Sequence, residues 1–310
     1  MRRATDDADA VSADLIPRDV RARLKDIPLG ARLAVGREGF GQHSSRSRGA
    51  GLEFAQYRAY EPGDEPRQVD WKLYARSDRY FVREAERDSP LTAWIVIDAT
   101  ASMAQADPDR PGWTRLDAAR ALAACTVEIA LRQGDRFGLA SIGGAGVRVH
   151  AAGTGSRQRD RCLLALHALN ASGRWPADAA LQPAWERMAP GNLVLMLGDG
   201  FDDAATAFAT RLAAARREVV AIRILTVGER DFAFDGGYRF RDPESGQELL
   251  GDAAALRAGF LERFMASREA LRARLAASGV RQVEHVLDEP LDQPLRRLFS
   301  HRGATHAETA

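Results

Sequence analysis

Two aspartates stand at the ends of apolar segments that are typical of buried strands. Asp98 follows the segment "TAWIVI", and Asp199 follows "NLVLMLG". In an open parallel sheet, the carboxyl ends of the strands meet at one edge, and ligands bind there. We therefore expect the two carboxylates to lie close together at that edge.

The residues after Asp98 add further oxygen atoms. Asp98, Thr100 and Ser102 occupy every second position of "DATAS". In a loop leaving a strand, this spacing can turn one carboxylate and two hydroxyls toward one point. Hard divalent cations such as Mg²⁺ prefer such oxygen ligands. The alternative is that Asp98 and Thr100 cap the next helix and satisfy loop amides. The pattern leaves a metal site and a capped loop both open.

An enzymatic interpretation uses the same aspartates. The segments "VIDATAS" and "GDGFDD" superficially resemble a haloacid-dehalogenase-like Mg-dependent phosphatase, with Asp98 as nucleophile and Asp199 and Asp203 as Mg²⁺ ligands. Thr100 stands where that class needs a general acid-base, and a threonine cannot serve as one. No lysine lies between Asp98 and Asp199 to steady a phosphoryl group. The non-enzymatic interpretation is therefore favoured.

The elements that position these residues follow an alternating order. From Thr92 onward, continuous apolar strands alternate with helical segments, which predicts a mostly parallel sheet with helices on both faces. A hairpin is predicted over 238–250 and a long helix over 253–278, followed by one more strand and helix. The predicted class is a doubly wound α/β fold.

A dense polar stretch over 39–76 precedes this pattern. Arginines, acids, aromatics and glycines alternate in it, and "EPGDEP" is a turn signal. Arginine forks can bridge carboxylates bidentately, so an internal network is expected. A partner surface of arginine and aromatic side chains is the alternative. The residues concerned are Glu53, Arg58, Tyr60, Gly63, Asp64, Arg67, Asp70, Trp71 and Arg76.

Composition narrows the class of protein. The 310 residues carry a formal net charge of +1, which gives no global field toward nucleic acid. No apolar run reaches membrane-spanning length, so no direct membrane insertion is expected. The two cysteines, Cys125 and Cys162, lack metal-ligand spacing. We expect a cytoplasmic protein that does not bind nucleic acid.

Two family resemblances combine these features. D-x-S/T-x-S after one strand, with a later strand ending in D-G, resembles the von Willebrand factor A domain and its metal-ion-dependent adhesion site. The stretch from Gly49 to Arg76, with "GLEFAQYRAYEPGDEPRQVDWKLYAR", resembles the family named domain of unknown function 58. Likeness to that family extends from about Leu29 to Phe299.

The resemblance implies a set of roles. Asp98, Thr100, Ser102 and Asp199 would be metal ligands, direct or through water. Trp175 stands where the family places a further threonine, so Mg²⁺ binding is expected to be weak or absent. Thr154 and Ser156 are the candidates for a substitute of that threonine. The implied partners are a MoxR-type AAA+ ATPase and protein clients. The chain has no G-x-x-x-x-G-K-[ST] motif, so the ATPase is expected to be another chain.

The expected organisation has four parts. They are an N-terminal tail and short helix over 1–28, a β-rich module over 29–90, a von Willebrand A-like α/β domain over 91–302 and a disordered tail over 303–310.

Overall fold

The structure is a computed structural model of the chain. It describes residues 15–30, 54–60, 69–85, 91–200, 202–232, 236–241 and 246–299, together with Phe234 and Glu244. The chain divides into two compact units: residues 42–90 form the small unit, and the remainder forms the large unit.

The small unit contains an antiparallel strand pair and a helix. Strand β1 (Phe54–Ala59) pairs with β2 (Phe81–Ala85), and α3 (Trp71–Ser77) lies between them in sequence. Asp70 caps α3, because its Oδ1 accepts the N–H groups of Lys72 and Leu73 at 2.9 and 3.0 Å. Aromatic rings gather around α3: Tyr74 and Tyr80 stack 4.5 Å apart, and Trp71, 59% exposed, meets both edge-on.

Most of the predicted arginine and acid network lies outside the described part of the chain. This applies to Glu53, Gly63, Asp64 and Arg67, and to the side chain of Arg58. Arg76 is exposed on α3. The network therefore stays a prediction.

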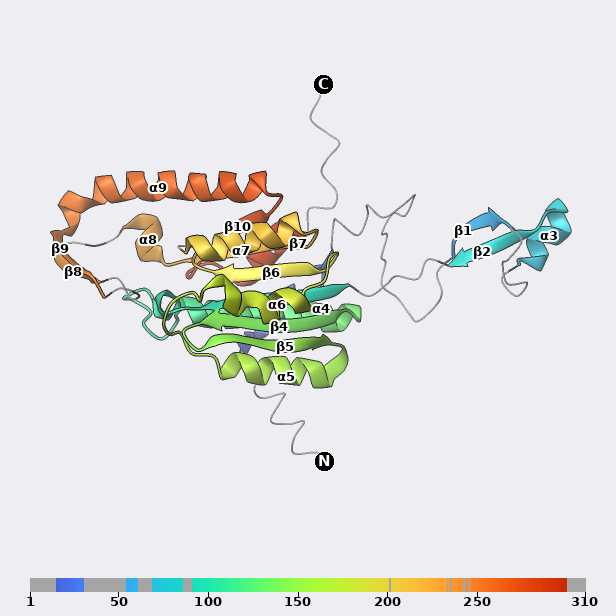
Figure 1. Cartoon of the computed structure of the whole chain (residues 1–310), viewed down its shortest axis with the longest axis horizontal. Coiled ribbons are helices and arrows are strands. Elements are labelled where there is room, and N and C mark those ends of the chain that lie inside the picture. The colour runs from blue at the N-terminus through green and yellow to red at the C-terminus, as the bar shows by residue number, and fades with distance from the viewer. Residues whose placement is uncertain are drawn as a thin grey trace, which may run out of the picture. The chain divides into compact units, whose positions relative to one another are not determined.

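The large unit is built on a six-stranded sheet (Figure 1). Its order is β10-β7-β6-β3-β4-β5, and all pairs are parallel except β4 with β5. The strands are β3 (Thr92–Ala99), β4 (Arg136–Gly143), β5 (Gly146–Gly153), β6 (Leu193–Gly198), β7 (Glu218–Leu225) and β10 (Arg281–Val286).

The four central strands are apolar because both of their faces are covered. In β3, seven of the eight residues are buried, whereas β5 at the edge has no fully buried residue. The expected mostly parallel, doubly wound α/β class is confirmed.

Helices form a layer on each face of the sheet. One apolar core contains buried side chains of α4 (Arg115–Gln133), α5 (Gly155–His167) and α10 (Asp292–Phe299). The other contains those of α6 (Gln182–Arg187), α7 (Asp203–Ala214) and α9 (Ala253–Ala277). Odd-numbered residues of β3 such as Ile95 face the first core, and Trp94 and Val96 face the second.

The segment before the small unit also joins the first core. Helix α2 (Arg18–Arg23) places Val20 there, together with Ile16, Leu24 and Ile27. The short helix expected within residues 1–28 spans Arg18–Arg23. Arg132 of α4 donates to the carbonyls of Leu24 and Ile27, which fastens the segment to the sheet's helical layer.

Two short elements follow β7. Helix α8 (Val227–Asp231) begins at a capping box made by Thr226 and Glu229. Strands β8 (Gly237–Arg241) and β9 (Glu248–Asp252) form the predicted hairpin and lead into α9.

Candidate functional site

Asp98 and Asp199 meet at one edge of the sheet, as the sequence predicts. β3 and β6 are parallel neighbours, with Ile97 opposite Leu197. Both aspartates are buried, at 5% and 1% exposure. Gly198 permits the close approach, since a Cβ atom there would lie only 2.9 Å from the Cβ of Asp98.

Asp98 organises the loop that follows it. Its Oδ1 accepts the backbone N–H of Thr100 at 2.9 Å, and the Thr100 and Ser102 hydroxyls lie 3.1 Å apart. Ser102 belongs to a 3-10 helix, Ala101–Ala104. Burial, and then the charge of Asp199, raise the pKa of Asp98 to about 7. Asp98, Thr100 and Ser102 are thus brought together, and the carboxylate serves the loop amide.

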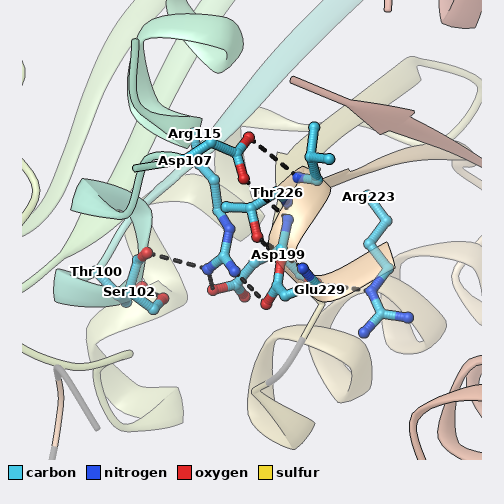
Figure 2. Close-up of polar contacts among 10 residues, drawn as sticks. Thr100, Ser102, Asp107, Arg115, Asp199, Arg223, Thr226 and Glu229 are labelled. Atoms are coloured by element: carbon cyan, nitrogen blue, oxygen red, sulfur yellow. Dashed lines mark hydrogen bonds and ion pairs between the residues drawn. The ribbon is translucent and has the colours of Figure 1, made fainter. Parts of the chain in front are cut away.

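A cation that the sequence analysis did not single out lies beside them. Arg115, the first residue of α4, is only 1% exposed. Its Nη1 donates to the Ser102 carbonyl at 3.1 Å and to Asp199 Oδ2 at 3.2 Å, and its Nη2 pairs with Glu229 Oε1. Figure 2 shows the guanidinium between these three acceptors. One positive charge therefore faces two carboxylates at the strand ends.

The local sequence explains the position of Arg115. Thr114, immediately before it, and Asp117, two residues after it, form the capping box that starts α4. A positive side chain at a helix N-terminus opposes the helix dipole. The carboxylates of Asp199 and Glu229 compensate for this unfavourable interaction. They hold the Arg115 side chain at a position where the helix dipole alone would disfavour a positive charge.

Helix α8 is tied to the same point. Glu229 Oε2 accepts the N–H of Thr226 at 2.9 Å while its other oxygen pairs with Arg115. Asp107 accepts the N–H groups of Val227 and Gly228, at 3.0 and 2.9 Å, in the first turn of α8. The loops after β3 and β7 are joined by these bonds.

A second arginine fixes the loop after β6. Arg223 of β7 is 3% exposed, and its Nε donates to the Asp199 carbonyl at 2.8 Å. Its Nη1 lies 3.7 Å from Glu284 Oε1. Backbone and side chain of Asp199 are therefore held by two different arginines.

This arrangement does not fit a divalent cation. The Asp199 carboxylate and the Ser102 carbonyl are already bound by a guanidinium, and the Thr100 and Ser102 hydroxyls contact each other. In the described part of the chain, no group of three or more His, Cys, Asp or Glu side chains is placed to hold a metal.

The remaining expected oxygen ligands are also absent from the edge. Trp175 is buried at 8% exposure, with its ring 6.4 Å from that of Phe208. Thr154 and Ser156 follow β5, whose last residue, Gly153, pairs with Phe137 near the start of β4. They lie at the opposite edge of the sheet, so the hypothesis that one of them substitutes for the threonine is wrong.

The phosphatase arrangement is likewise not assembled. Asp203, the proposed third acid, is 92% exposed and pairs with Arg274 at 2.7 Å. Its neighbour Asp202 caps α7. The Asp203 carboxylate therefore does not join Asp98 and Asp199 in one site.

Arg115 and Glu229 are the residues that sequence reasoning missed. The signal for Arg115 was present: "TRLD" places an arginine at the first position of a helix that begins with a capping box. A charge so poorly matched to the helix dipole indicates a nearby acid. Glu229 carried no comparable signal, because its own capping box explains it completely.

Comparison with known families gives a match that covers parts of both units. The model of the family described as "Protein of unknown function DUF58" matches residues 56–270. The chain belongs to this family. Related proteins include uncharacterized proteins of Mycobacterium tuberculosis and Mycobacterium bovis, each 28% identical over 216 residues, or 66% of this chain. The match spans 65% of the length of these curated relatives.

Solved structures similar to this DUF58 protein include von Willebrand A domains. BatB of Bacteroides thetaiotaomicron has a TM-score of 0.43 and 14% identity, covering 67% of this chain and 95% of that one. The SpRpn10 VWA domain has a TM-score of 0.37 and 16% identity, with 67% and 95% covered. The mostly parallel α/β class of this DUF58 chain rests on its own sheet order, β10-β7-β6-β3-β4-β5. In its described residues, no helix is long and apolar enough to cross a membrane.

Proposed function

We propose that this DUF58 protein is a non-enzymatic protein-binding module. It serves as a partner or adaptor of a MoxR-type AAA+ ATPase in chaperone-like maturation or assembly of other proteins. The observation that carries the proposal is the internal neutralisation of the strand-end site by Arg115. Asp199 and Glu229 are bound to an arginine of the same chain, so this edge of the sheet holds the loops that contact a partner.

The loops at this edge supply the contact surface. Residues 108–112 are exposed and stand next to Asp107, which anchors them to α8. Arg110 lies over the Trp113 ring, 5.0 Å from its centre. Arginine and tryptophan are enriched in protein interfaces, and a rigidly anchored loop loses little entropy on binding.

The AAA+ partner is proposed on the family resemblance and on one sequence fact. The chain lacks a phosphate-binding G-x-x-x-x-G-K-[ST] motif, so ATP hydrolysis requires another chain. A metal ion has no part in the proposal, because Arg115 supplies the positive charge at the strand ends.

Capture from the native cell tests this function. The tagged protein is expected to co-purify with an AAA+ ATPase of MoxR type, identified by mass spectrometry. Arg110→Glu should weaken that capture. Arg157→Glu is the matched control, because Arg157 is exposed on α5, which begins at the opposite edge of the sheet.

Two results would contradict the proposal. One is the absence of any such ATPase from the captured proteins. The other is equal recovery of the ATPase with Arg110→Glu and with the wild-type chain.

A further inference from the structure

A pocket lies on the face of the sheet that α7 and α9 cover, next to the strand-end site. Residues of β3, β6 and β7 form its floor, and residues of α7 and α9 form its walls. It is partly open to solvent, and its cavity volume is about 60 Å³. A water molecule needs about 10–15 Å³ of such a cavity, so there is room for about five heavy atoms.

Two rows of residues that run across the sheet make up the floor. In the row nearest the strand ends, Gly198 of β6 lies opposite Arg223 of β7 and beside Asp98 of β3. The row beneath it includes Val96 and Met196, which lie opposite each other. All five residues line the pocket. The floor is therefore charged at the strand ends and apolar one row further in.

The charged row has a gap in its middle, because Gly198 has no side chain. Adjacent strands lie about 4.8 Å apart, so the Cα atoms of Asp98 and Arg223 are separated by about 10 Å. A Cβ atom at Gly198 would lie 3.2 Å from Asp98 Oδ2. The Asp98 carboxylate therefore borders the space above the glycine, which belongs to the pocket.

Other carboxylates near this end of the sheet have arginine partners. The ion pairs are those of Asp199 and Glu229 with Arg115, and of Glu284 with Arg223 and Arg268. Glu284 lies on β10, on the side of Arg223 that faces away from the gap. Because Glu284 compensates the charge of Arg223, a second cation in the gap does not face an isolated guanidinium.

Asp98 has no cation partner in the described part of the chain. Its side chain is almost fully buried, and among these residues it accepts hydrogen bonds from Thr100 alone. The charges that act on it, those of Asp199 and Glu244, are both negative. A buried carboxylate without a paired cation is costly. A cation from outside the chain is therefore favoured beside it.

We infer that this pocket binds a primary ammonium group on a short, unbranched apolar stem, as a lysine side chain provides. The ammonium donates a charge-assisted hydrogen bond to Asp98 Oδ2 from the space above Gly198. The stem lies on Val96 and Met196, between the walls formed by α7 and α9. The methylenes and nitrogen of a lysine side chain fill about the volume available. A carboxylate ligand is repelled by Asp98.

This site goes beyond the proposed function, and only its polypeptide source rests on that function. A lysine of a protein partner and a free alkylamine carry the same group. Such a cation needs one carboxylate acceptor, whereas a divalent metal ion needs several oxygen ligands. The strand ends offer the first and not the second, since the Asp199 carboxylate and the Ser102 carbonyl are bound by Arg115.

The methyl group of Met196 reports binding at the floor of the pocket. The chain has five methionines, so ¹³C-methyl labelling gives few signals, and Met196→Leu assigns the relevant one. The first probe is n-butylammonium, which we expect to shift the Met196 signal of the full chain saturably. The uncharged 1-butanol, with the same stem, should bind at least about tenfold more weakly.

Removal of the carboxylate charge provides the first variant. Asp98→Asn keeps the shape of the side chain and an acceptor for the Thr100 N–H, and should weaken n-butylammonium binding at least about tenfold. Asp203→Asn is the matched control, since Asp203 is exposed on α7 and should leave binding unchanged. The signal of Met103, which is completely buried in the first core, checks that each variant is folded.

A filled pocket provides the second variant. Ala205→Leu places bulk in the wall formed by α7 and should abolish the shift. Ala204→Leu is its control, because Ala204 is the exposed preceding residue of the same helix and should leave binding unchanged.

Two capped peptides test the polypeptide source. Ala-Lys-Ala should bind at least as tightly as n-butylammonium, as a polypeptide source requires. The same peptide with norleucine in place of lysine keeps the apolar stem without the charge, and should bind at least about tenfold more weakly than Ala-Lys-Ala.

The inference is overturned by an unmoved Met196 signal with n-butylammonium, by equal binding of 1-butanol, or by undiminished binding in folded Asp98→Asn or Ala205→Leu. Exclusion of the lysine peptide with retained n-butylammonium binding would overturn the polypeptide source and leave a site for a free amine. Failure of the ATPase capture alone leaves these readings intact, so the two proposals fail separately.

Discussion

The Arg115 guanidinium and the Asp199 carboxylate form an ion pair at 3.2 Å, with side-chain exposures of 1% and 2%. Arg115 begins α4 and Asp199 directly follows β6, so the pair joins two residues that are 84 positions apart in sequence. Glu229 completes it from α8. The strand ends of this DUF58 protein are therefore held together by an internal cation.

Removal of that cation should be strongly destabilising. Arg115→Met leaves Asp199 and Glu229 without their common partner, and we expect a loss of about 3–5 kcal/mol in the free energy of unfolding. Arg211→Ala is the control, because the Arg211 pair with Asp178 is exposed and should contribute less than about 1 kcal/mol. Urea unfolding measures both. Similar small losses would contradict a structural role for the buried pair.

Magnesium should not stabilise the protein. A ligand that binds only the folded state at a hundredfold excess over its Kd raises stability by about 2.7 kcal/mol. Because Arg115 occupies the acceptors, we expect a Tm change below about 1 °C with millimolar Mg²⁺. Thermal unfolding with and without the ion tests this. A saturable rise that disappears in Asp199→Asn would place a metal at the strand ends.

The two hydrogen bonds between Asp107 and α8 should contribute less to the free energy of unfolding than the Arg115 ion pair does. Asp107→Ala removes two acceptors from the first turn of the helix, which we expect to cost about 0.5–2 kcal/mol. Asp109→Ala, in the exposed part of the same loop, should have almost no effect. Chemical unfolding compares the two variants. If Asp109→Ala lowers the free energy of unfolding as much as Asp107→Ala does, the hydrogen bonds of Asp107 have no particular stabilising role.

Much of this fold follows from local patterns, whereas the site does so only in part. The continuous apolar runs before Asp98 and Asp199 predict buried parallel strands, and the sheet rule then brings the two carboxylates together. Arg115 and Glu229 reach the same point from helices whose starts are set by their own capping boxes. Their meeting depends on where the folded sheet places the starts of α4 and α8, which no short sequence pattern encodes.

Acid should destabilise the protein through His285. This residue of β10 is completely buried, and burial lowers its pKa from the usual 6.5 to about 4. The folded state therefore keeps the imidazole neutral where the unfolded chain protonates it. Its contribution to stability is complete above pH 6.5 and is lost as the pH falls toward 4.

The size of the effect follows from the two pKa values. Between about pH 7.5 and about pH 5, the wild-type chain should lose about 2 kcal/mol through this group. His285→Leu removes the titration and should lose correspondingly less over the same interval. His150→Leu is the control, since His150 is exposed on β5 and should follow the wild type. Urea unfolding at both pH values measures the difference. Parallel losses in all three proteins would mean that the His285 ring is protonated as readily in the folded state as in the unfolded chain.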